Sequence, residues 1–358
     1  MKLLALSLIA AALAAQPPEK RPEPAAAAPA PAAPSTAPLV VEGIVNAPPA
    51  ELWRVFTTGD GFKNLGAAKA EIDLRVGGLM RSHYDPKGVL GDEGTIQNQI
   101  ISFEPERMIS FRIHKPPAGF PFTNAWKDTW SVATFTDLGD GRTHVRLSTM
   151  GYTTDDESQK MKAFFEAGNG WVLKKLQSIY DKGVKPAAGD AHAQNTLAPI
   201  EHEIIVAAPR QEVYNAYTTS DGWKSWSGVT SKIECRPGGP FEIYFSTEPP
   251  AGQRGSEGCT VLSFDPGRMF SYTWNAPPKF AHARQFHTWV VVTFDEVNAN
   301  ATRVRIRHLG FAEQAAAHTD HEQEWKDTRA YFDAAWGRVL QGLAAHYQAS
   351  PSAEAPPK

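Results

Sequence analysis

The sequence predicts an α+β protein with two tandem domains, each a curved antiparallel sheet wrapped around one long C-terminal helix. Three observations predict it. The chain repeats itself at a fixed offset, each copy alternates apolar and polar residues, and each copy ends in a long stretch with apolar residues at helical spacing. With 358 residues, 42% of them hydrophobic and 21% charged, the chain is large enough for two folded units of common size.

The first residues predict export. Met1 and Lys2 precede an apolar run that ends at Leu13 and has the length of a signal-peptide core, and residues 12–14 offer a cleavage site of small residues. The run is too short to span a bilayer, which needs about 20 apolar residues. We therefore expect residues 1–15 to be a signal peptide, and the protein to be periplasmic or secreted from a bacterium without a stable membrane span.

Three further segments are expected to lie outside the folded domains. Residues 16–38 are mostly alanine and proline; alanine buries little area and proline cannot donate a hydrogen bond, so this stretch is a disordered tether. Residues 184–198 form a linker rich in alanine and glycine, and 349–358 form a disordered tail. The two domains are then expected at 39–183 and 199–348.

An internal repeat organises the chain. Four motifs of the first half recur in the same order in the second half, at one offset of about 161 residues. Ordered matches at a fixed offset predict two copies of one domain. The pairs are APPAELW (47–53) with APRQEVY (208–214), TTGDGFK (57–63) with TTSDGWK (218–224), RVGG (75–78) with RPGG (236–239), and SFEPERM (102–108) with SFDPGRM (263–269).

The elements of the second copy follow in order. Residues 203–206 predict a short strand, and Pro209 opens a helix at a position where its missing N–H is harmless. Gly238 and Gly239 supply a hairpin turn, because glycine adopts positive φ without strain. The further strands are predicted at about 229–235, 240–247, 257–264, 268–275, 286–295 and 302–309.

Alternation along the strands predicts which face of the sheet is buried. Phe270 and Trp274 share one side of their strand, since successive side chains point to opposite faces. In the last strand Val304, Ile306 and His308 alternate with three arginines. This pattern is typical of an antiparallel sheet that is covered on one side only.

A long C-terminal helix is predicted to cover that side. Its apolar residues fall three and four positions apart, so they form one continuous stripe in each copy. The first copy carries Asn169 where the second carries Trp336. The stripe consists of Phe332, Trp336, Val339, Leu340, Leu343 and Tyr347 in the second copy and of Phe165, Val172, Leu173, Leu176 and Tyr180 in the first.

These motifs resemble the activator of heat shock protein 90 ATPase homolog 1-like family, which belongs to the START-like (SRPBCC) superfamily. The resemblance covers both copies. In the first copy Leu65 replaces a family tryptophan, Thr149 replaces the family histidine, and the segment after Gly94 is about three residues longer. The second copy matches the family pattern at Trp226, Gly238, Gly239, Glu257, Gly258, Pro266, Trp274, His308, Gly310 and Gly337.

The resemblance implies a helix-grip fold, with a cavity between the helix and the sheet. It does not imply one activity, because members of the superfamily bind lipids, sterols and hormones, cyclise substrates or contact chaperones. The sequence itself contains no nucleophile elbow, phosphate-binding loop or dinucleotide-binding glycine motif, so we expect no cofactor. The net charge of −3 leaves no basic surplus for a nucleic-acid partner.

Large aromatic side chains are the candidate walls of the cavity. They supply rigid apolar surface, which is what ligand pockets are mostly lined with. Each of them, taken singly, can instead fill the core of a small sheet. The candidates are Trp226, Tyr244, Trp274, Trp289 and Trp336 in the second copy, and Phe111, Trp130 and Phe165 in the first.

His308 is the candidate polar contact, because alternation places it on the inward face close to where the helix crosses. An imidazole titrates near neutral pH, so it can hydrogen-bond a ligand or transfer a proton. The alternative is a core histidine whose nitrogens are satisfied within the protein. His83, His114 and His287 fall on strand faces where solvated histidines are common.

Two other groups of residues suggest a metal site and a disulfide, and the sequence supports each of these only weakly. His318, His321 and Glu322 lie together near the start of a helix, but no further ligand follows at a known spacing, so a solvated turn without metal is expected. Cys235 and Cys259 invite a disulfide in an exported protein. A strand is predicted between theirs, however, which sets them about 10 Å apart and beyond bridging reach.

The sequence therefore favours an exported, non-catalytic protein that holds a hydrophobic small molecule, either a lipid or an aromatic metabolite, in a helix-grip cavity. Two alternatives stay open. One is a protein-interaction module like the chaperone activators of the family, and the other is a START-like enzyme of the cyclase or hydrolase type.

Overall fold

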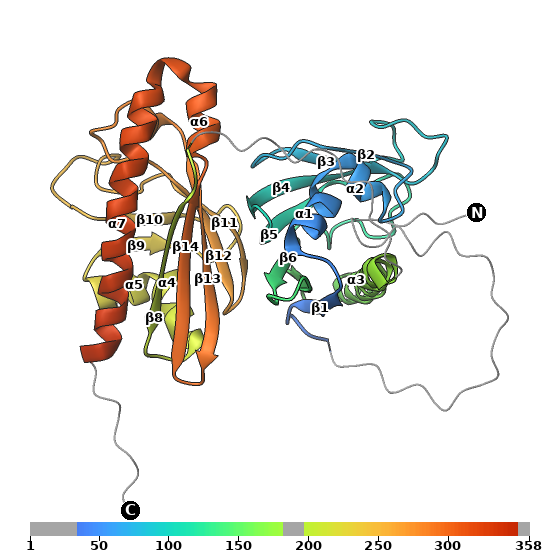
Figure 1. Cartoon of the computed structure of the whole chain (residues 1–358), viewed down its shortest axis with the longest axis horizontal. Coiled ribbons are helices and arrows are strands. Elements are labelled where there is room, and N and C mark those ends of the chain that lie inside the picture. Colours follow the sequence, from blue (N-terminus) through green and yellow to red (C-terminus); the bar gives the residue numbers. More distant parts are fainter. Residues whose placement is uncertain (1–33, 182–196, 350–358) are drawn as a thin grey trace, which may run out of the picture. The chain divides into compact units, whose positions relative to one another are not determined.

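The computed structural model describes residues 34–181 and 197–349, which fall into two compact units (Figure 1). We call them domain 1 (34–181) and domain 2 (197–349). The expected signal peptide lies outside the described residues, as do most of the expected linkers and tail. No helix within the described residues is long and apolar enough to cross a membrane.

Domain 1 is a seven-stranded antiparallel sheet that packs against one long helix, α3 (Figure 1). The strand order is β1-β7-β6-β5-β4-β3-β2, so the first strand pairs with the last. The elements are β1 (Leu39–Val45), α1 (Pro49–Thr57), α2 (Gly59–Lys63), β2 (Lys69–Ile72), β3 (Leu79–His83), β4 (Ile96–Glu104), β5 (Met108–Lys115), β6 (Trp130–Asp137), β7 (Thr143–Met150) and α3 (Asp156–Asp181).

Domain 2 repeats this topology with its sheet divided into five strands and two. The order is β11-β12-β13-β14-β8, and the β10-β9 hairpin adjoins β11 through a single bridge between Pro240 and Thr260. The elements are β8 (Ile200–Val206), α4 (Arg210–Thr218), α5 (Ser220–Ser227), β9 (Thr230–Ile233), β10 (Phe241–Tyr244), β11 (Val261–Asp265), β12 (Met269–Trp274), η2 (Ala283–Gln285), β13 (Thr288–Asn298), β14 (Ala301–Leu309), α6 (Phe311–Ala317), η3 (Thr319–His321) and α7 (Glu322–Ala349).

The inward face of the domain 2 sheet is the predicted one. Val304, Ile306 and His308 of β14 are fully buried, whereas the arginines that alternate with them are not. Arg307 forms an ion pair with Glu201 of β8 on the other face. Figure 1 shows α7 lying along the sheet. The residues that α7 buries include Trp325, Phe332, Trp336, Leu340 and Leu343.

The repeated TT-x-DG motif has a local structural reason. The Thr58 hydroxyl accepts a hydrogen bond from the Gly61 backbone N–H and caps α2, and Thr219 does the same for Gly222 and α5. A Cβ atom at Gly61 would lie 2.2 Å from the backbone oxygen of Arg54. Glycine at this position therefore lets the second short helix approach the first closely.

The predicted boundaries differ most around β10 and β11. The strands expected at 240–247 and 257–264 are shorter, because the chain between them leaves the sheet as a loop. Gly252 and Gly258 in this loop adopt positive φ, which interrupts extended pairing. Pro209 is the N-cap of α4 and not its first helical residue.

Both cysteines are free thiols. Cys235 follows β9 and Cys259 precedes β11, and β10 lies between these strands. Strands two apart in a sheet are separated by about 10 Å, which is too far for a disulfide.

Candidate ligand cleft

A polar network fills the space where α7 crosses the sheet of domain 2. The indole N–H of Trp336 donates to Nδ1 of His308 at 2.9 Å, and Nε2 of His308 lies 2.7 Å from the Thr288 hydroxyl. That hydroxyl in turn donates to the Trp274 carbonyl oxygen at 3.0 Å. Because Nδ1 accepts from Trp336, Nε2 carries the proton and donates to Thr288.

His308 is therefore a core histidine and not a ligand contact. Its side chain is fully buried and both ring nitrogens are bonded within the protein. Burial, with a smaller effect of the Arg329 charge, lowers the pKa of His308 well below its usual value. A neutral imidazole with no free nitrogen neither transfers protons nor orients a guest, so the satisfied alternative of the sequence analysis is the one that the structure shows.

Trp226 lies away from the crossing point. Its indole N–H donates to the Ala216 carbonyl oxygen at 3.0 Å, and its ring packs 4.6 Å from that of Trp223. The ring also approaches Gly342 of α7. Gly342 is ten residues beyond Phe332, which is about 15 Å along a helix. Trp226 thus seals α5 against the C-terminal half of α7.

Tyr244 faces away from the helix. Alternation along β10 buries Phe241 and Ile243 and turns Tyr244 to the other side, where its hydroxyl donates to Glu242 at 2.6 Å. The guanidinium of Arg254 lies 4.8 Å from the centre of the tyrosine ring. The prediction that Tyr244 lines the helix–sheet gap is wrong, because the side-chain period of the strand places it on the opposite face.

The prediction that Trp289 lines the helix–sheet gap is wrong for the same reason. In β13, Val290 pairs with His308 and faces inward, so Trp289 points to the outer face. Its ring packs on Gly310, where a Cβ atom would come within 2.7 Å of the indole. Trp289 therefore explains the glycine at that position and plays no part in the gap.

A cleft of domain 2 opens beside the N-terminal half of α7 and has a volume of about 220 Å³. Strand β12, helix α7 and the loops after β10 and β12 form its walls. The polar groups at its edge include Ser246, Gln253, Arg254 and Asn275. The apolar walls are Phe245, Trp274, Pro277, Pro278, Tyr331 and Phe332.

The two loops of the cleft are held by charged side chains. Arg284 donates to the carbonyl oxygens of Gly255 in the first loop, at 3.0 Å, and of Ala276 in the second. Glu324 of α7 accepts the backbone N–H groups of residues 282–283, both at 2.9 Å. These hydrogen bonds link the two loops to each other and to α7.

Of the five aromatic candidates in domain 2, only Trp274 lines this cleft. Trp336 packs beneath it, with its ring 5.4 Å from that of Trp274. Phe245 and Tyr331 also line the cleft and are not among the predicted residues. Phe245 lies one residue beyond β10 and Tyr331 lies beside the predicted stripe, so strand alternation and helix spacing do not point to them.

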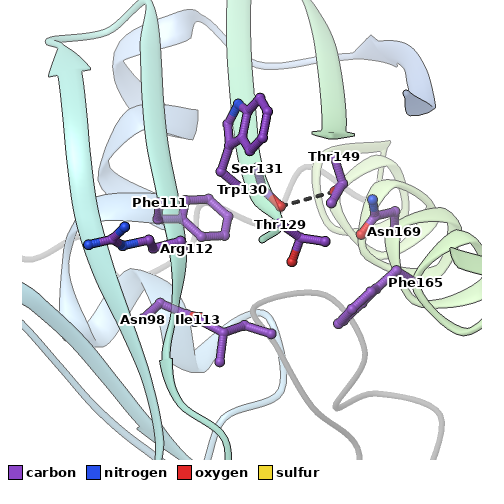
Figure 2. Close-up of a pocket in the computed structure, with 10 residues that line it drawn as sticks. All are labelled: Asn98, Phe111, Arg112, Ile113, Thr129, Trp130, Ser131, Thr149, Phe165 and Asn169. Carbon is purple, nitrogen blue, oxygen red and sulfur yellow. Dashed lines mark hydrogen bonds between the residues drawn. The ribbon is translucent and has the colours of Figure 1, made fainter. Parts of the chain in front are cut away.

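Domain 1 has a much smaller cavity, of about 10 Å³, beside Thr149 and Asn169, the residues that stand where domain 2 has His308 and Trp336 (Figure 2). The candidates Phe111, Trp130 and Phe165 are among its lining residues. The indole of Trp130 nevertheless points away from the cavity, because alternation along β6 turns Ser131 inward (Figure 2). The polar side chains around the cavity are Asn98, Thr129, Ser131, Thr149 and Asn169.

Side chains of domain 1 fill the opening beside the N-terminal half of α3, which we call the mouth of domain 1. Phe122 packs with its ring 5.2 Å from that of Phe120 and 5.6 Å from that of Phe164, and Phe164 lies 5.5 Å from Phe165. These rings form one hydrophobic cluster. Phe164 and Phe165 occupy the helix positions that Tyr331 and Phe332 occupy in domain 2.

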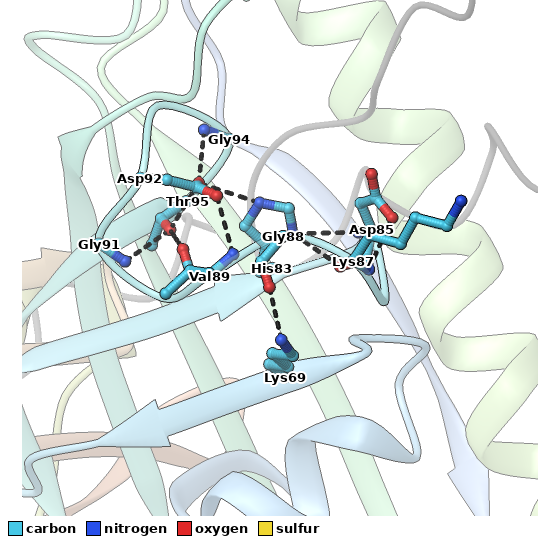
Figure 3. Close-up of polar contacts among 10 residues, drawn as sticks. All are labelled: Lys69, His83, Asp85, Lys87, Gly88, Val89, Gly91, Asp92, Gly94 and Thr95. Carbon is cyan, nitrogen blue, oxygen red and sulfur yellow. Dashed lines mark hydrogen bonds and ion pairs between the residues drawn. The ribbon is translucent and has the colours of Figure 1, made fainter.

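His83 organises the loop that follows β3 (Figure 3). Its Nε2 lies 3.0 Å from the Asp92 carboxylate, and its Nδ1 accepts the Asp85 backbone N–H at 3.0 Å. Hydrogen bonds from Val89 and Gly94 lower the pKa of Asp92. The buried imidazole thus anchors a loop, and the expected solvated histidine is absent from this position.

His318 and His321 of the expected solvated turn contact a third histidine, His282, from the segment between β12 and β13. The His321 ring stacks 3.5 Å from His282, and His318 lies 5.0 Å from the same ring. Among the described residues no group of histidine, cysteine and carboxylate side chains has the geometry to hold a metal ion. His114 and His287 are exposed.

A family model described as Activator of Hsp90 ATPase homolog 1-like protein matches residues 46–181 and 207–348. The chain belongs to this family. The two matches are tandem copies, and each domain has the α+β helix-grip fold that the repeat and the resemblance predict. No curated protein matches the chain.

Similar solved structures include the di-domain ARO/CYC BexL from the BE-7585A biosynthetic pathway, with 13% identity over 88% of this chain and 99% of that one and a TM-score of 0.33. A protein from Mesorhizobium loti shares 20% identity over 40% of this chain and 97% of its own, with a TM-score of 0.33. The Aha1 dimer from Colwellia psychrerythraea shares 14% identity over 40% and 94%, with a TM-score of 0.31. The family assignment rests on the sequence match.

Proposed function

We propose that the protein is an exported, non-catalytic carrier whose domain 2 cleft holds a small planar aromatic molecule. The observation that supports this is the cleft itself, which is preformed, concave and walled by Trp274, Tyr331 and Phe332. Ligand sites are typically concave and mostly apolar, with a few polar groups that set orientation. Gln253 and Asn275 at the edge are groups of that kind.

The volume of the cleft selects the size of the guest. A cavity of about 150 Å³ holds benzene, so about 220 Å³ suits one or two fused rings. An extended lipid chain needs more room than this, and drug-sized ligands occupy roughly 300–1,000 Å³. Of the two ligand classes favoured by the sequence, we therefore propose the aromatic one.

The residues around the cleft favour binding over catalysis. The side chains that line it include no histidine, cysteine, lysine or carboxylate. Ser246, Ser256 and Tyr331 contribute hydroxyls, but no general base among the lining residues is present to activate them. The guanidinium of Arg254 is paired with Glu257 at 2.7 Å. His308, on the inward face of the sheet, is neutral and fully bonded, and His202 on the same face is bonded to Asp333 of α7 at 2.8 Å.

Export is the second part of the proposal and is supported by the basic start and apolar run of residues 1–13. An exported chain does not meet an ATP-driven cytosolic chaperone, which is why we place ligand binding ahead of a chaperone-related interaction. Cell fractionation with N-terminal sequencing tests this part. A protein that begins near residue 16 outside the cytoplasm supports it, and an uncleaved cytoplasmic protein would favour the interaction module.

Calorimetric titration tests the ligand. We expect indole, 1-naphthol or a related bicyclic compound to bind the full-length protein, and palmitate to bind at least tenfold more weakly. Phe245→Ala removes one wall that is 54% exposed in the free protein, so it should weaken binding roughly 5- to 30-fold without loss of stability. Val297→Ala is the matched control, because Val297 is 48% exposed and does not line the cleft.

If a broad panel of one- and two-ring compounds fails to bind, or if Phe245→Ala and Val297→Ala bind equally, the proposed site is wrong. Tight binding of palmitate that is weakened by Phe245→Ala would favour a lipid ligand in place of the aromatic one.

A further inference from the structure

We propose that His282, His318 and His321 form a pH-sensitive contact, the histidine latch, which holds the segment between β12 and β13 against the start of α7 at neutral pH and releases it in acid. The latch belongs to the protein without a ligand, so it is tested independently of the proposed function.

The first observation is a stack of two imidazole rings at van der Waals distance. The ring centres of His282 and His321 are 3.5 Å apart, and the ring planes differ by 8°. The ring of His318 meets that of His282 edge-on at 5.0 Å. The three residues come from separate parts of the chain, namely the N-cap of η2, the end of α6 and η3. Neutral imidazoles can stack in this way, whereas two imidazolium ions at this distance repel each other.

The second observation is the environment of one ring nitrogen. Nε2 of His282 is buried and has no hydrogen-bond partner among the described residues. A neutral imidazole carries a proton on only one nitrogen, but an imidazolium ion has two N–H donors and needs an acceptor for each. A proton added to His282 in this position would therefore create a buried, unpaired donor or a repelled charge, and both are unfavourable.

The charged groups around the stack agree with this direction. Desolvation, and then the charges of His321 and His318, lower the pKa of His282. The carboxylate of Glu324 on α7 lies 4.0 Å from Nδ1 of His321 and acts in the opposite sense without reversing the shift. Arg284 adds a positive charge in the short helix that His282 caps. Because the pKa is lowered by folding, the latch is stable above the usual histidine pKa of about 6.5 and is lost as the pH falls below it.

The latched segment also carries the contacts that connect the cleft walls. Glu324 accepts the backbone N–H groups of residues 282–283, both at 2.9 Å. Arg284 donates to the Gly255 carbonyl oxygen at 3.0 Å, and residues 277–278 form part of the cleft wall. Separation of the histidine rings displaces these backbone groups from α7. We therefore expect acid to loosen this side of the cleft before domain 2 unfolds.

Hydrogen exchange of the full-length protein at about pH 7.5 and about pH 5.5 tests the latch, after correction for the intrinsic pH dependence of exchange. Peptides covering 276–287 should lose about tenfold in protection relative to peptides from the C-terminal half of α7, because one unit of pKa shift corresponds to a tenfold change in equilibrium. Unchanged protection of 276–287 would overturn the proposal. An equal loss throughout domain 2 would also overturn it, since this would be global unfolding.

Histidine variants test which residues are responsible. His321→Gln removes one titrating ring of the stack at a side chain that is 45% exposed, so the domain should remain folded and the tenfold loss should shrink to about twofold or less. His282→Gln should act in the same way and keeps its backbone bond to Glu324. His346→Gln is the matched control, because it removes a histidine from the other end of α7. If both latch variants respond to pH as the control does, the histidines do not form the latch.

Discussion

The two domains share one fold and differ in what occupies the opening between the sheet and the N-terminal half of the long helix. In domain 1 the segment between β5 and β6 folds back, and its Phe122 packs on Phe164 of the long helix. In domain 2 the corresponding segment between β12 and β13 also contacts the helix, with the Phe280 ring 5.9 Å from that of Tyr331, but Tyr331 and Phe332 still border an open cleft. Phenylalanine rings of the chain itself thus occupy in domain 1 the place that we assign to an aromatic guest in domain 2.

The interiors differ in the same sense. Domain 2 closes its centre with the large pair His308 and Trp336, whereas domain 1 carries Thr149 and Asn169 and leaves a small polar cavity. Domain 1 thus combines a filled opening with a polar interior, and domain 2 combines an open cleft with a solid interior. The two copies share the positions that build the fold and differ in the side chains at the opening and in the interior.

The largest expected effect follows from the solid interior of domain 2. Trp336→Ala removes a buried ring and leaves Nδ1 of His308 without its donor, so it should destabilise domain 2 by about 3–5 kcal/mol. The matched change in domain 1, Asn169→Ala, should cost no more than about 1–2 kcal/mol. Urea unfolding of the full-length chain, followed by hydrogen exchange of peptides from α3 and α7, separates the two. Equal losses would show that the two interiors do not differ as described.

The next effect tests whether Phe122 takes the place of a ligand. Phe122→Ala should destabilise domain 1 by about 3 kcal/mol and leave a vacancy beside Phe120 and Phe164. Toluene at millimolar concentration should then recover part of the loss, because a guest that binds only the folded state stabilises it by mass action.

The control for this experiment is Tyr152→Phe, which alters another buried ring of the same cluster without opening the mouth. Toluene should leave its stability unchanged. If toluene fails to rescue Phe122→Ala, the mouth of domain 1 collapses when emptied and the comparison with the preformed cleft of domain 2 does not hold.

The sequence predicts the fold and the buried face of the domain 2 sheet correctly. Val304 and Ile306 alternate with arginines, so the inward face follows from the strand period alone. The same period, applied to Tyr244 and Trp289, would have placed both on the outer face. Their aromatic character suggests the gap, but residue type is weaker evidence than position.

The cleft itself could not be predicted in this way. Phe245 lies on a loop whose path depends on the hydrogen bonds of Arg284, which comes about 40 residues later in the chain. The hydrogen bond between Trp336 and His308 could not be predicted for a similar reason. It depends on the rotation of α7 about its axis, which the sequence does not specify. Contacts between distant segments decide both.

The smallest effect that we predict is one of pH. Burial lowers the pKa of His308, so the folded domain 2 binds no proton there while the unfolded chain does below about pH 6.5. The contribution of His308 to stability is fully present above that pH and is lost as the pH falls below it. By pH 5.5 the loss should reach about 1.4 kcal/mol.

Thr149, the matching residue of domain 1, does not titrate, so the exchange of α3 peptides should change less over the same range. His308→Gln should reduce the slope for α7 peptides, and an unchanged slope would mean that other groups, such as the stacked His282, carry the pH dependence.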